Sequence, residues 1–255
     1  MRTPLAPEFL KRPLAHRGYH NRAVGRPENS GSAFLAAIAG GYGIELDVQM
    51  SRDGQAMVFH DEELYRLTAA TGLVKDQNAA ALGNILLRDC EESIRTLPQI
   101  LSLIAGRAPV LIEIKDQTDA MAQTDGRLEQ AVAAALADYH GPAAVMSFNP
   151  HCVAQMAQLA PHIARGLTTS AYGADWHPLN TGTCDRLRQI PDFDATGSVF
   201  ISHDAADLER PRVAELKSGG AAILCWTIRS AVAEDAARKI ADNITFESYA
   251  ALISA

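Results

Sequence analysis

Short β-rich runs alternate with helical stretches along the whole chain of 255 residues, and this alternation restricts the possible folds more than any other feature. Such alternation is typical of a parallel sheet whose strands are joined by crossover helices. The predicted strands are Pro13–His16, Gly43–Ser51, Pro109–Lys115, Ala143–Phe148, Ile163–Thr169, Ser198–Ser202, Ala221–Ile228 and Asn243–Phe246. The predicted helices are Gly31–Gly40, Leu97–Gly106, Asp125–Tyr139, Cys152–Leu159, Arg212–Lys217 and Ala231–Ile240.

This number of strand–helix units in a chain of 255 residues favours a (β/α)8 TIM barrel over an open doubly wound sheet. No Gly-x-Gly-x-x-Gly or Walker sequence supports a nucleotide-binding open sheet. The alternation is interrupted over residues 51–95, which contain the hairpin turn Arg52–Gln55 and a turn-like stretch at Thr68–Val74. We interpret this stretch as an insertion after the second strand that rests on one mouth of the barrel. Because no repeat or linker divides the sequence, we expect a single domain over residues 1–255.

Composition limits the partners that such a barrel can have. The net charge of −7 argues against a nucleic-acid-binding protein. Residues 1–26 nevertheless carry six basic side chains and one acidic side chain, which fits either a small anionic ligand or a solvated basic end. No apolar run reaches the roughly 18 residues of a membrane span, and the N-terminus lacks a hydrophobic signal core. The four cysteines are widely spaced and read as reduced thiols, so we expect a cytoplasmic protein.

Two predicted strands carry acidic residues on the face that should point into the barrel. Alternate residues of a strand share one face, so Glu45 and Asp47 point away from the apolar residues between them. In the next strand Glu113 and Lys115 follow the same rule, which directs three carboxylates and one ammonium into the barrel. A buried ion network around Lys115 is one interpretation. The surplus of acid over base indicates instead a divalent cation with oxygen ligands, Mg²⁺, Ca²⁺ or Mn²⁺ rather than zinc.

Two histidines lie where the strands are expected to reach the same mouth. His16 ends the first predicted strand, and the next residue, Arg17, offers a planar set of donors for a phosphate or carboxylate. His60 ends the hairpin that opens the insertion. A single histidine at a strand end is more often structural, so neither residue identifies a site by itself. Among the other histidines, His203 is the strongest further candidate.

Several short motifs follow one another over almost the whole chain. They are Ala15-His16-Arg17-Gly18, Pro27-Glu28-Asn29-Ser30, Glu45-Leu46-Asp47-Val48, Asp53-Gly54, His60-Asp61, Thr68–Val74, Glu113-Ile114-Lys115, Ser147-Phe148 and Trp226-Thr227. In content and order they resemble the glycerophosphodiester phosphodiesterase family, most specifically in the first 115 residues. The resemblance implies a (β/α)8 barrel with a small insertion after the second strand, as the alternation also predicts.

The resemblance also implies a role for each matching residue. The carboxylates matching the metal ligands are Glu45, Asp47 and Glu113, with Glu28 as an acid near the metal site. The acid–base pair matches His16 and His60. The residues matching those that contact the substrate are Arg17, Lys115 and Trp226. For Trp226 the alternative is core packing beside Leu224 and Ile228.

The activity implied is the hydrolysis of a glycerophosphodiester to sn-glycerol 3-phosphate and an alcohol, with one divalent cation, Mg²⁺ or Ca²⁺, or else Mn²⁺. The attacking group is either water or the 2-hydroxyl of the glycerol, which would give a transient cyclic phosphate. One alternative is a non-catalytic phosphodiester-binding protein on the same scaffold, and another is an enzyme that resembles a lysophospholipase D. The complete set of histidines and acids favours an enzyme, and the lack of a clear apolar rim favours a small-molecule substrate.

Two segments depart from the family pattern. The family usually has Ile-Thr-Asp-x-Pro after the last strand, whereas this chain has Phe246, Glu247 and Ser248 at the last three of these positions. Residues 170–197 match poorly, and we expect a loop specific to a subgroup there. The catalytic histidines and carboxylates lie outside both segments, so we expect the departures to affect substrate detail rather than catalysis.

Overall fold

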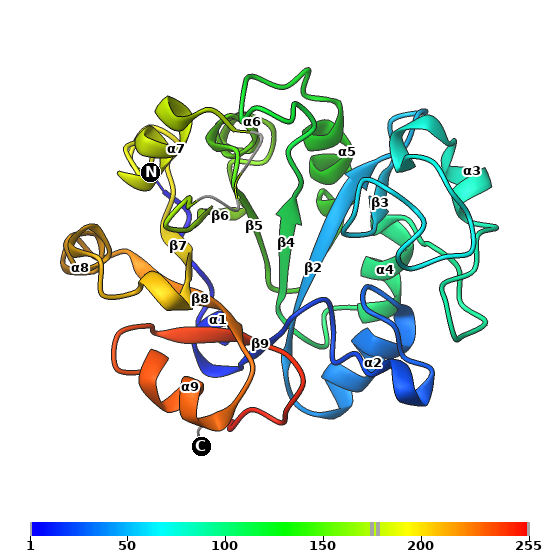
Figure 1. The fold of residues 1–255 in the computed structure, drawn as a ribbon, viewed down its shortest axis with the longest axis horizontal. Helices are drawn as coiled ribbons and strands as arrows, with labels where there is room; N and C mark the ends of the chain where they lie inside the picture. The colour runs from blue at the N-terminus through cyan, green and yellow to red at the C-terminus, as the bar shows by residue number, and fades with distance from the viewer. Residues whose placement is uncertain (1, 174–175, 177–178, 254–255) are drawn as a thin grey trace.

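A closed parallel barrel forms the centre of the molecule in the computed structural model, which describes residues 2–173, 176 and 179–253 (Figure 1). Parallel pairing runs in the order β1-β2-β4-β5-β6-β7-β8-β9, and β9 pairs with β1 to close the sheet. The barrel strands are β1 (Leu14–Ala15), β2 (Gly43–Met50), β4 (Val110–Ile114), β5 (Ala143–Ser147), β6 (Ala164–Thr169), β7 (Phe200–Asp204), β8 (Ala222–Ile228) and β9 (Asn243–Phe246). The (β/α)8 barrel predicted from the alternation is confirmed.

Helices surround the barrel as an outer ring (Figure 1). The ring consists of α2 (Gly31–Ala39), α4 (Leu97–Ile104), α5 (Arg127–Leu136), α6 (Pro150–Leu159), α7 (Thr181–Arg188), α8 (Pro211–Ser218) and α9 (Ala231–Ala237). The described residues also include short 3₁₀ turns, η1 (Arg22–Val24), η2 (Val74–Asp76) and η4 (Ala205–Asp207). In the described part of the chain, no helix has both the length and the apolar character of a membrane span.

Helix α7 corrects the expectation of a loop over residues 170–197. The Asn180 side chain accepts a hydrogen bond from the backbone N–H of Thr183 and so caps the first turn. The helix then buries Cys184 and Leu187 in a small apolar cluster with Tyr172. The sequence of α7 is mostly polar and contains a glycine, so tertiary packing rather than helix propensity determines this element.

Two apolar layers follow from the alternation of residues along the strands. Ile44 and Leu46 of β2 and Ile112 of β4 belong to the main core between sheet and helices. Leu111, the neighbour of Ile112, points to the opposite face of β4 and belongs to a smaller cluster with Phe200. The short helix α1 (Glu8–Lys11) adds Phe9 to that cluster. The smaller cluster therefore fills the barrel interior, and the acidic residues of β2 and β4 point the same way.

The segment between β2 and α4 contains β3 (Ala56–Val58) and the short helix α3 (Ala79–Leu82), outside the ring of parallel strands (Figure 1). β3 pairs antiparallel with the end of β2, with Val58 opposite Val48. The segment has its own apolar cluster, which includes Phe59 and Leu64. This packing fixes the chain that follows β3, so His60, the residue after Phe59, is held at the mouth of the barrel.

Candidate active site

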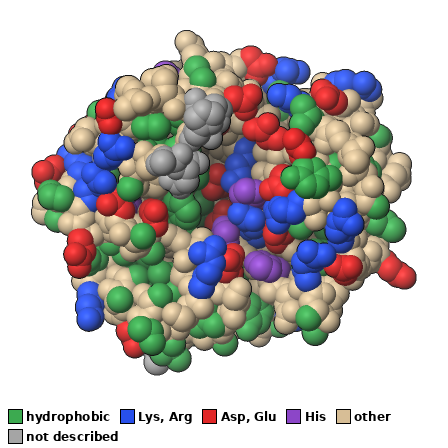
Figure 2. Space-filling model, viewed as in Figure 1, with side chains coloured by type: hydrophobic (Ala, Val, Ile, Leu, Met, Phe, Trp, Pro, Cys, Tyr) green, Lys and Arg blue, Asp and Glu red, His purple; other side chains and the backbone are tan. Residues whose placement is uncertain are grey.

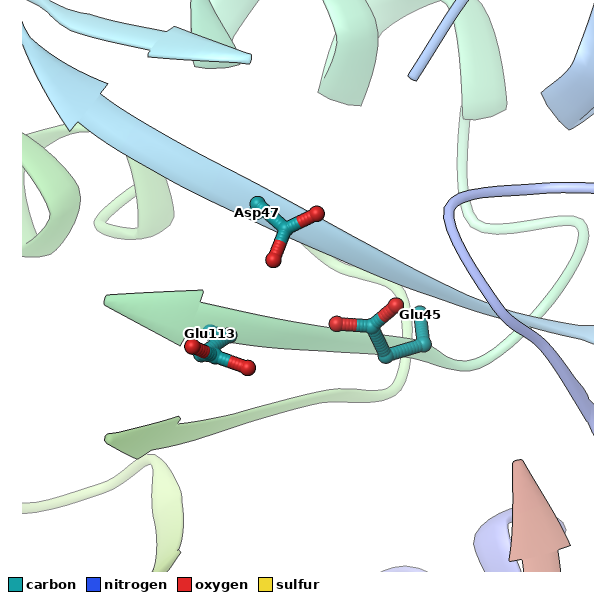
Figure 3. Close-up of side chains that lie close together, drawn as sticks. All are labelled: Glu45, Asp47 and Glu113. Carbon is teal, nitrogen blue, oxygen red and sulfur yellow. The ribbon is translucent and has the colours of Figure 1, made fainter. Parts of the chain in front are cut away.

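Three buried carboxylates from two neighbouring strands form a cluster inside the barrel (Figure 3). Glu45 and Asp47 come from β2 and Glu113 from β4, and the pairing of these strands places Asp47 opposite Glu113. One oxygen of each carboxylate lies within 4.8 Å of the others. The structure therefore brings together the three acidic residues that strand alternation selected from the sequence.

The charges in this cluster are only partly balanced. Burial, and then repulsion from Asp47 and Glu113, raises the pKa of Glu45 well above its ordinary value. Burial also acts to raise the pKa of Asp47, but Lys115 and other cationic neighbours hold it below its ordinary value. The Nζ atom of Lys115 lies 2.7 Å from Asp47 Oδ1 and 2.6 Å from Glu113 Oε1. Lys115 supplies one positive charge to three carboxylates, so an excess of negative charge remains.

The donor set fits a hard divalent cation. All three residues offer carboxylate oxygen, the ligand type that Mg²⁺ and Ca²⁺ prefer. Asp47 Oδ1 is fully buried and accepts no well-aligned hydrogen bond, although Lys115 lies close to it. Because Asp47 and Glu113 share this one ammonium group, it does not neutralise three buried carboxylates, and a bound cation would lower the cost of burying them. The raised pKa of Glu45 means that the carboxylate lacks enough positive charge around it, and a bound cation would restore its ionised form.

Arg17 connects this cluster to a second group of charges. Its backbone has a left-handed conformation, with φ 55°, and its N–H donates to Glu45 Oε2 at 2.9 Å. Its Nη1 donates to Glu28 Oε1 at 2.7 Å, and its Nε lies 3.4 Å from Asp47 Oδ2. Both oxygens of Glu28 also accept hydrogen bonds from Arg66, at 2.7 and 2.8 Å. Glu28 thus lies among the arginines and outside the cluster of three carboxylates.

The Nδ1 atom of each predicted histidine lies within hydrogen-bond distance of a carboxylate oxygen. His16 Nδ1 lies 2.5 Å from Glu247 Oε2, and His60 Nδ1 lies 2.7 Å from Asp61 Oδ1. The other ring nitrogen of His16, Nε2, lies 4.0 Å from Glu45 Oε2. Burial lowers the pKa of His16, against its hydrogen bond to the Glu247 carboxylate, which raises the pKa. Both rings line one cavity, so the structure places the two histidines at the same site.

This cavity has a volume of about 260 Å³. It opens at the hollow in Figure 2, where histidine, basic and acidic side chains gather. The charged and ionisable residues of its lining are His16, Arg17, Glu45, His60, Glu113, Lys115 and Arg229. Its other side includes Phe148, Trp176 and Trp226, and the ring of Phe148 meets that of Trp226 edge-on with centroids 5.5 Å apart. The site can hold a molecule with one strongly anionic end and one less polar end.

Trp226 lines the cavity, as the resemblance implies, and its indole Nε1 donates to the Ser202 carbonyl at 3.0 Å. The alternative, packing beside Leu224 and Ile228 on one face, is not what the structure shows. Leu224 belongs to the barrel interior, whereas Ile228 belongs to the outer core. The pairing of β8 with β9 shifts register between Cys225 and Ile228, so the two-residue alternation fails at this point.

Sequence reasoning did not single out Arg66, Asn29 or Glu247 as site residues with a role. Arg66 donates to Asp61 as well as to Glu28, and so joins the partner of His60 to the partner of Arg17. The Asn29 amide donates to Asp47 Oδ2 at 2.9 Å, and its oxygen lies 3.3 Å from the Asp47 backbone N–H. Asn29 belongs to the motif Pro27-Glu28-Asn29-Ser30, and this motif was the one sequence signal that could have identified it. Arg66 lies in a loop without periodicity and gave none.

His203, the further histidine candidate, lies away from this cavity. Its ring is fully buried in the sheet, where it lies 2.8 Å from Thr169 Oγ1 and 3.2 Å from Asp207 Oδ2. Burial lowers its pKa, against the charge of Asp207. A buried histidine with a partner at each ring nitrogen is a structural residue.

Comparisons with known proteins agree with this geometry. The profile of the Glycerophosphoryl diester phosphodiesterase family matches residues 16–245. The chain is 37% identical over 175 residues to the uncharacterized protein YqiK of Bacillus subtilis, covering 64% of this chain and 69% of that protein. It is 31% identical over 163 residues to the glycerophosphodiester phosphodiesterase of Caldanaerobacter subterraneus subsp. tengcongensis, covering 60% of this chain and 65% of that enzyme.

The fold is also similar to that of a solved phosphodiesterase from Oleispira antarctica, determined in complex with the product sn-glycerol-3-phosphate. The TM-score is 0.75 at 23% sequence identity, over 92% of each chain. At this level of identity the similarity establishes the barrel architecture.

Proposed function

Since the chain belongs to the glycerophosphoryl diester phosphodiesterase family, we propose that it hydrolyses glycerophosphodiesters to sn-glycerol 3-phosphate and an alcohol with one divalent cation. This membership confirms the family that the motifs predicted, and it confirms the predicted enzyme class. The observation that carries the proposal is one cavity lined by His16, His60, Arg17, Lys115, Glu45 and Glu113. Asp47 lies beside this lining, with its carboxylate against Lys115 and close to those of Glu45 and Glu113.

Glu45, Asp47 and Glu113 would hold the cation, which is Mg²⁺, Ca²⁺ or Mn²⁺ in this proposal. When bound, such an ion withdraws charge from a phosphate oxygen and lowers the pKa of an attacking oxygen. The carboxylates are oriented for this role by neighbouring donors. Asn29 fixes Asp47, and the Arg17 backbone N–H fixes Glu45.

The two cations face the position of the phosphate. Although burial opposes it, Asp47 and Glu113 raise the pKa of Lys115, so its side chain remains an ammonium ion. Arg17 is held by Glu28 through Nη1, and its guanidinium lines the cavity. Both groups would stabilise the negative charge that develops on the phosphoryl oxygens.

His16 and His60 would divide the proton transfers. One takes the proton of the attacking oxygen, and the other protonates the departing alkoxide. We assign the base to His16, which is more buried and adjoins Glu45, and the acid to His60, which approaches from the segment after β3. The attacking oxygen is water or the 2-hydroxyl of the substrate, and detection of a cyclic phosphate intermediate would distinguish them.

Four free cysteines, three of them buried, support the proposal of a cytoplasmic location, where thiols stay reduced. One apolar core with members in every barrel strand supports the proposal that residues 1–255 form one domain. The substrate in this proposal is a small molecule. A lipid-acting enzyme of the lysophospholipase D type and a non-catalytic phosphodiester-binding protein are the competing functions.

The test is an assay of purified protein with glycerophosphocholine, glycerophosphoethanolamine and glycerophosphoglycerol, each with Mg²⁺, Ca²⁺ or Mn²⁺. We expect stoichiometric release of sn-glycerol 3-phosphate with at least one metal. Turnover of lysophosphatidylcholine alone would establish the lipid-acting alternative. Binding of glycerophosphodiesters by calorimetry without any product would establish the binding protein.

Replacing Arg17 by alanine should lower kcat/KM by about 10²- to 10³-fold, the usual effect of losing one donor to a developing oxyanion. Arg17→Lys should recover part of this loss, because an ammonium group keeps the charge and lacks the planar pair of donors. Mg²⁺ affinity, measured as the rise of Tm with metal concentration, should change little in either variant.

The matched control is Arg22→Ala, which removes an exposed arginine of the same loop that pairs with Asp89. It should retain wild-type kcat/KM. Full activity in folded Arg17→Ala protein would show that Arg17 only supports the structure.

A further inference from the structure

We propose that Glu247 is a positioning residue that fixes the ring of His16 in the orientation and tautomer needed for proton transfer. This inference rests on the proposed function, because it assigns Glu247 a part in the same reaction. It concerns a segment in which the sequence departs from the pattern that the resemblance predicts, with Phe246 and Glu247 after Thr245.

The closure of the barrel brings Glu247 to His16. β1 and β9 pair in parallel with Ala15 opposite Phe246, and the His16 N–H donates to the Phe246 carbonyl at 2.9 Å. His16 and Glu247 are therefore the residues that follow each strand directly at the carboxyl end. This is the end of a barrel at which active sites are built.

Glu247, the residue after β9, directs its carboxylate toward the ring of His16. Phe246 is fully buried on the opposite side, where its ring packs against Tyr42 with centroids 4.7 Å apart. Glu247 is the next residue, and its side chain reaches His16. Phe246, at the position where the family pattern has aspartate, thus packs into the core, and the carboxylate that meets His16 belongs to the next residue, Glu247.

Two further contacts hold the carboxylate in place. Arg229 Nε donates to Glu247 Oε1 at 2.7 Å, while His16 contacts the other oxygen, Oε2, at 2.5 Å. His20 Nε2 also lies 3.8 Å from Oε2. With one oxygen held by Arg229, the carboxylate cannot turn away from His16 without losing an ion pair.

The charge of Glu247 determines the tautomer of His16. The hydrogen bond from His16 is the first cause that lowers the pKa of Glu247, and the one from Arg229 acts in the same direction, so the group is ionised. An ionised carboxylate only accepts hydrogen bonds, so Nδ1 of His16 must carry the hydrogen. In the neutral ring Nε2 is then unprotonated, and this nitrogen lies toward Glu45. His16 is thereby prepared to accept a proton at Nε2.

The first test compares Glu247→Gln and Glu247→Asp with the wild type on glycerophosphocholine. Glutamine preserves the shape but can donate to Nδ1, so kcat should fall about 10- to 10²-fold with little change in KM. Aspartate keeps the charge and should recover part of kcat. The matched control is Glu215→Gln, an exposed glutamate of α8 paired with Arg212, which should leave kcat unchanged.

The second test asks whether Glu247 acts through His16. The double variant His16→Ala/Glu247→Gln should be no slower than His16→Ala alone, because residues that act as a unit are not additive. Multiplicative losses, or an unchanged kcat in folded Glu247→Gln protein, would overturn the proposal.

The third test does not depend on activity. Ring ¹H–¹⁵N spectra at pH 8 should show His16 protonated at Nδ1 in the metal-free wild type, with the proton redistributed toward Nε2 in Glu247→Gln. An unchanged His16 tautomer in Glu247→Gln would refute the positioning role. If the wild type hydrolysed no glycerophosphodiester, the proposed function would fail, and these spectra would still decide whether Glu247 fixes His16.

Discussion

Removal of divalent cations with EDTA should reduce the hydrolysis of glycerophosphodiesters to the background rate. Glu45, Asp47 and Glu113 hold more negative charge than Lys115 balances, and Asp47 Oδ1 is buried without an aligned donor. Without a cation, burial and then repulsion within the cluster favour a protonated Glu45, and the phosphate loses its main source of charge neutralisation. Activity should return when Mg²⁺, Ca²⁺ or Mn²⁺ is added in excess of the chelator. Undiminished turnover after exhaustive chelation would contradict the proposed metal site.

Glu113→Gln tests the same site by a change in the protein. The amide keeps the size of the side chain and removes one anionic ligand, so the fold should persist while metal affinity falls. A ligand that binds only the folded state stabilises it by about 2.7 kcal/mol at a concentration one hundred times its Kd. Tm of the wild type should therefore rise with Mg²⁺ concentration, and that of Glu113→Gln should rise only at much higher concentrations. Glu215→Gln should follow the wild type, and equal metal-dependent rises in all three proteins would exclude Glu113 as a ligand.

The strand pattern was sufficient to predict the acidic cluster. A two-residue period determines which side chains enter the barrel, and the parallel pairing of neighbouring strands places those side chains near one another. Asp47 and Glu113 are paired residues of β2 and β4, so the prediction needed no long-range information. His16 was selected for a similar reason, because the carboxyl end of a barrel strand lies at the catalytic face.

Contacts across the seam of the barrel could not be predicted in this way. The contact of His16 with Glu247 depends on the register between the first and last strands, which the closed barrel sets and no local pattern records. The link from Arg66 to both Glu28 and Asp61 depends on how the segment after β3 folds over the mouth. At Trp226 the two-residue period itself fails, because β8 changes register after Cys225. These contacts come from tertiary structure, and they orient the residues that the local pattern identifies.

Replacing either His16 or His60 by alanine should slow hydrolysis of glycerophosphocholine by about 10²- to 10⁴-fold, the usual contribution of one proton-transfer group. The two variants should differ when the leaving group is changed. A general acid matters in proportion to how poor the leaving group is, because a stable anion departs without a proton. On the p-nitrophenyl diester of glycerol 3-phosphate, only the variant that lacks the acid should recover, and we expect this variant to be His60→Ala.

The structure gives a physical reason for this assignment. The side chain of His60 is about twice as exposed as that of His16, at 31% against 14%. His60 lies on the segment after β3, where a departing alcohol can leave the cavity. His16 is enclosed beside Glu45, where the attacking oxygen must be activated. His162→Ala, which alters an exposed histidine, should match the wild type on both substrates. Recovery of His16→Ala instead would reverse the two roles, and recovery of neither would show that the histidines do not divide the acid and base functions. Full activity of both variants on glycerophosphocholine would remove the histidine pair from the mechanism. Both proton transfers would then have to be made by solvent.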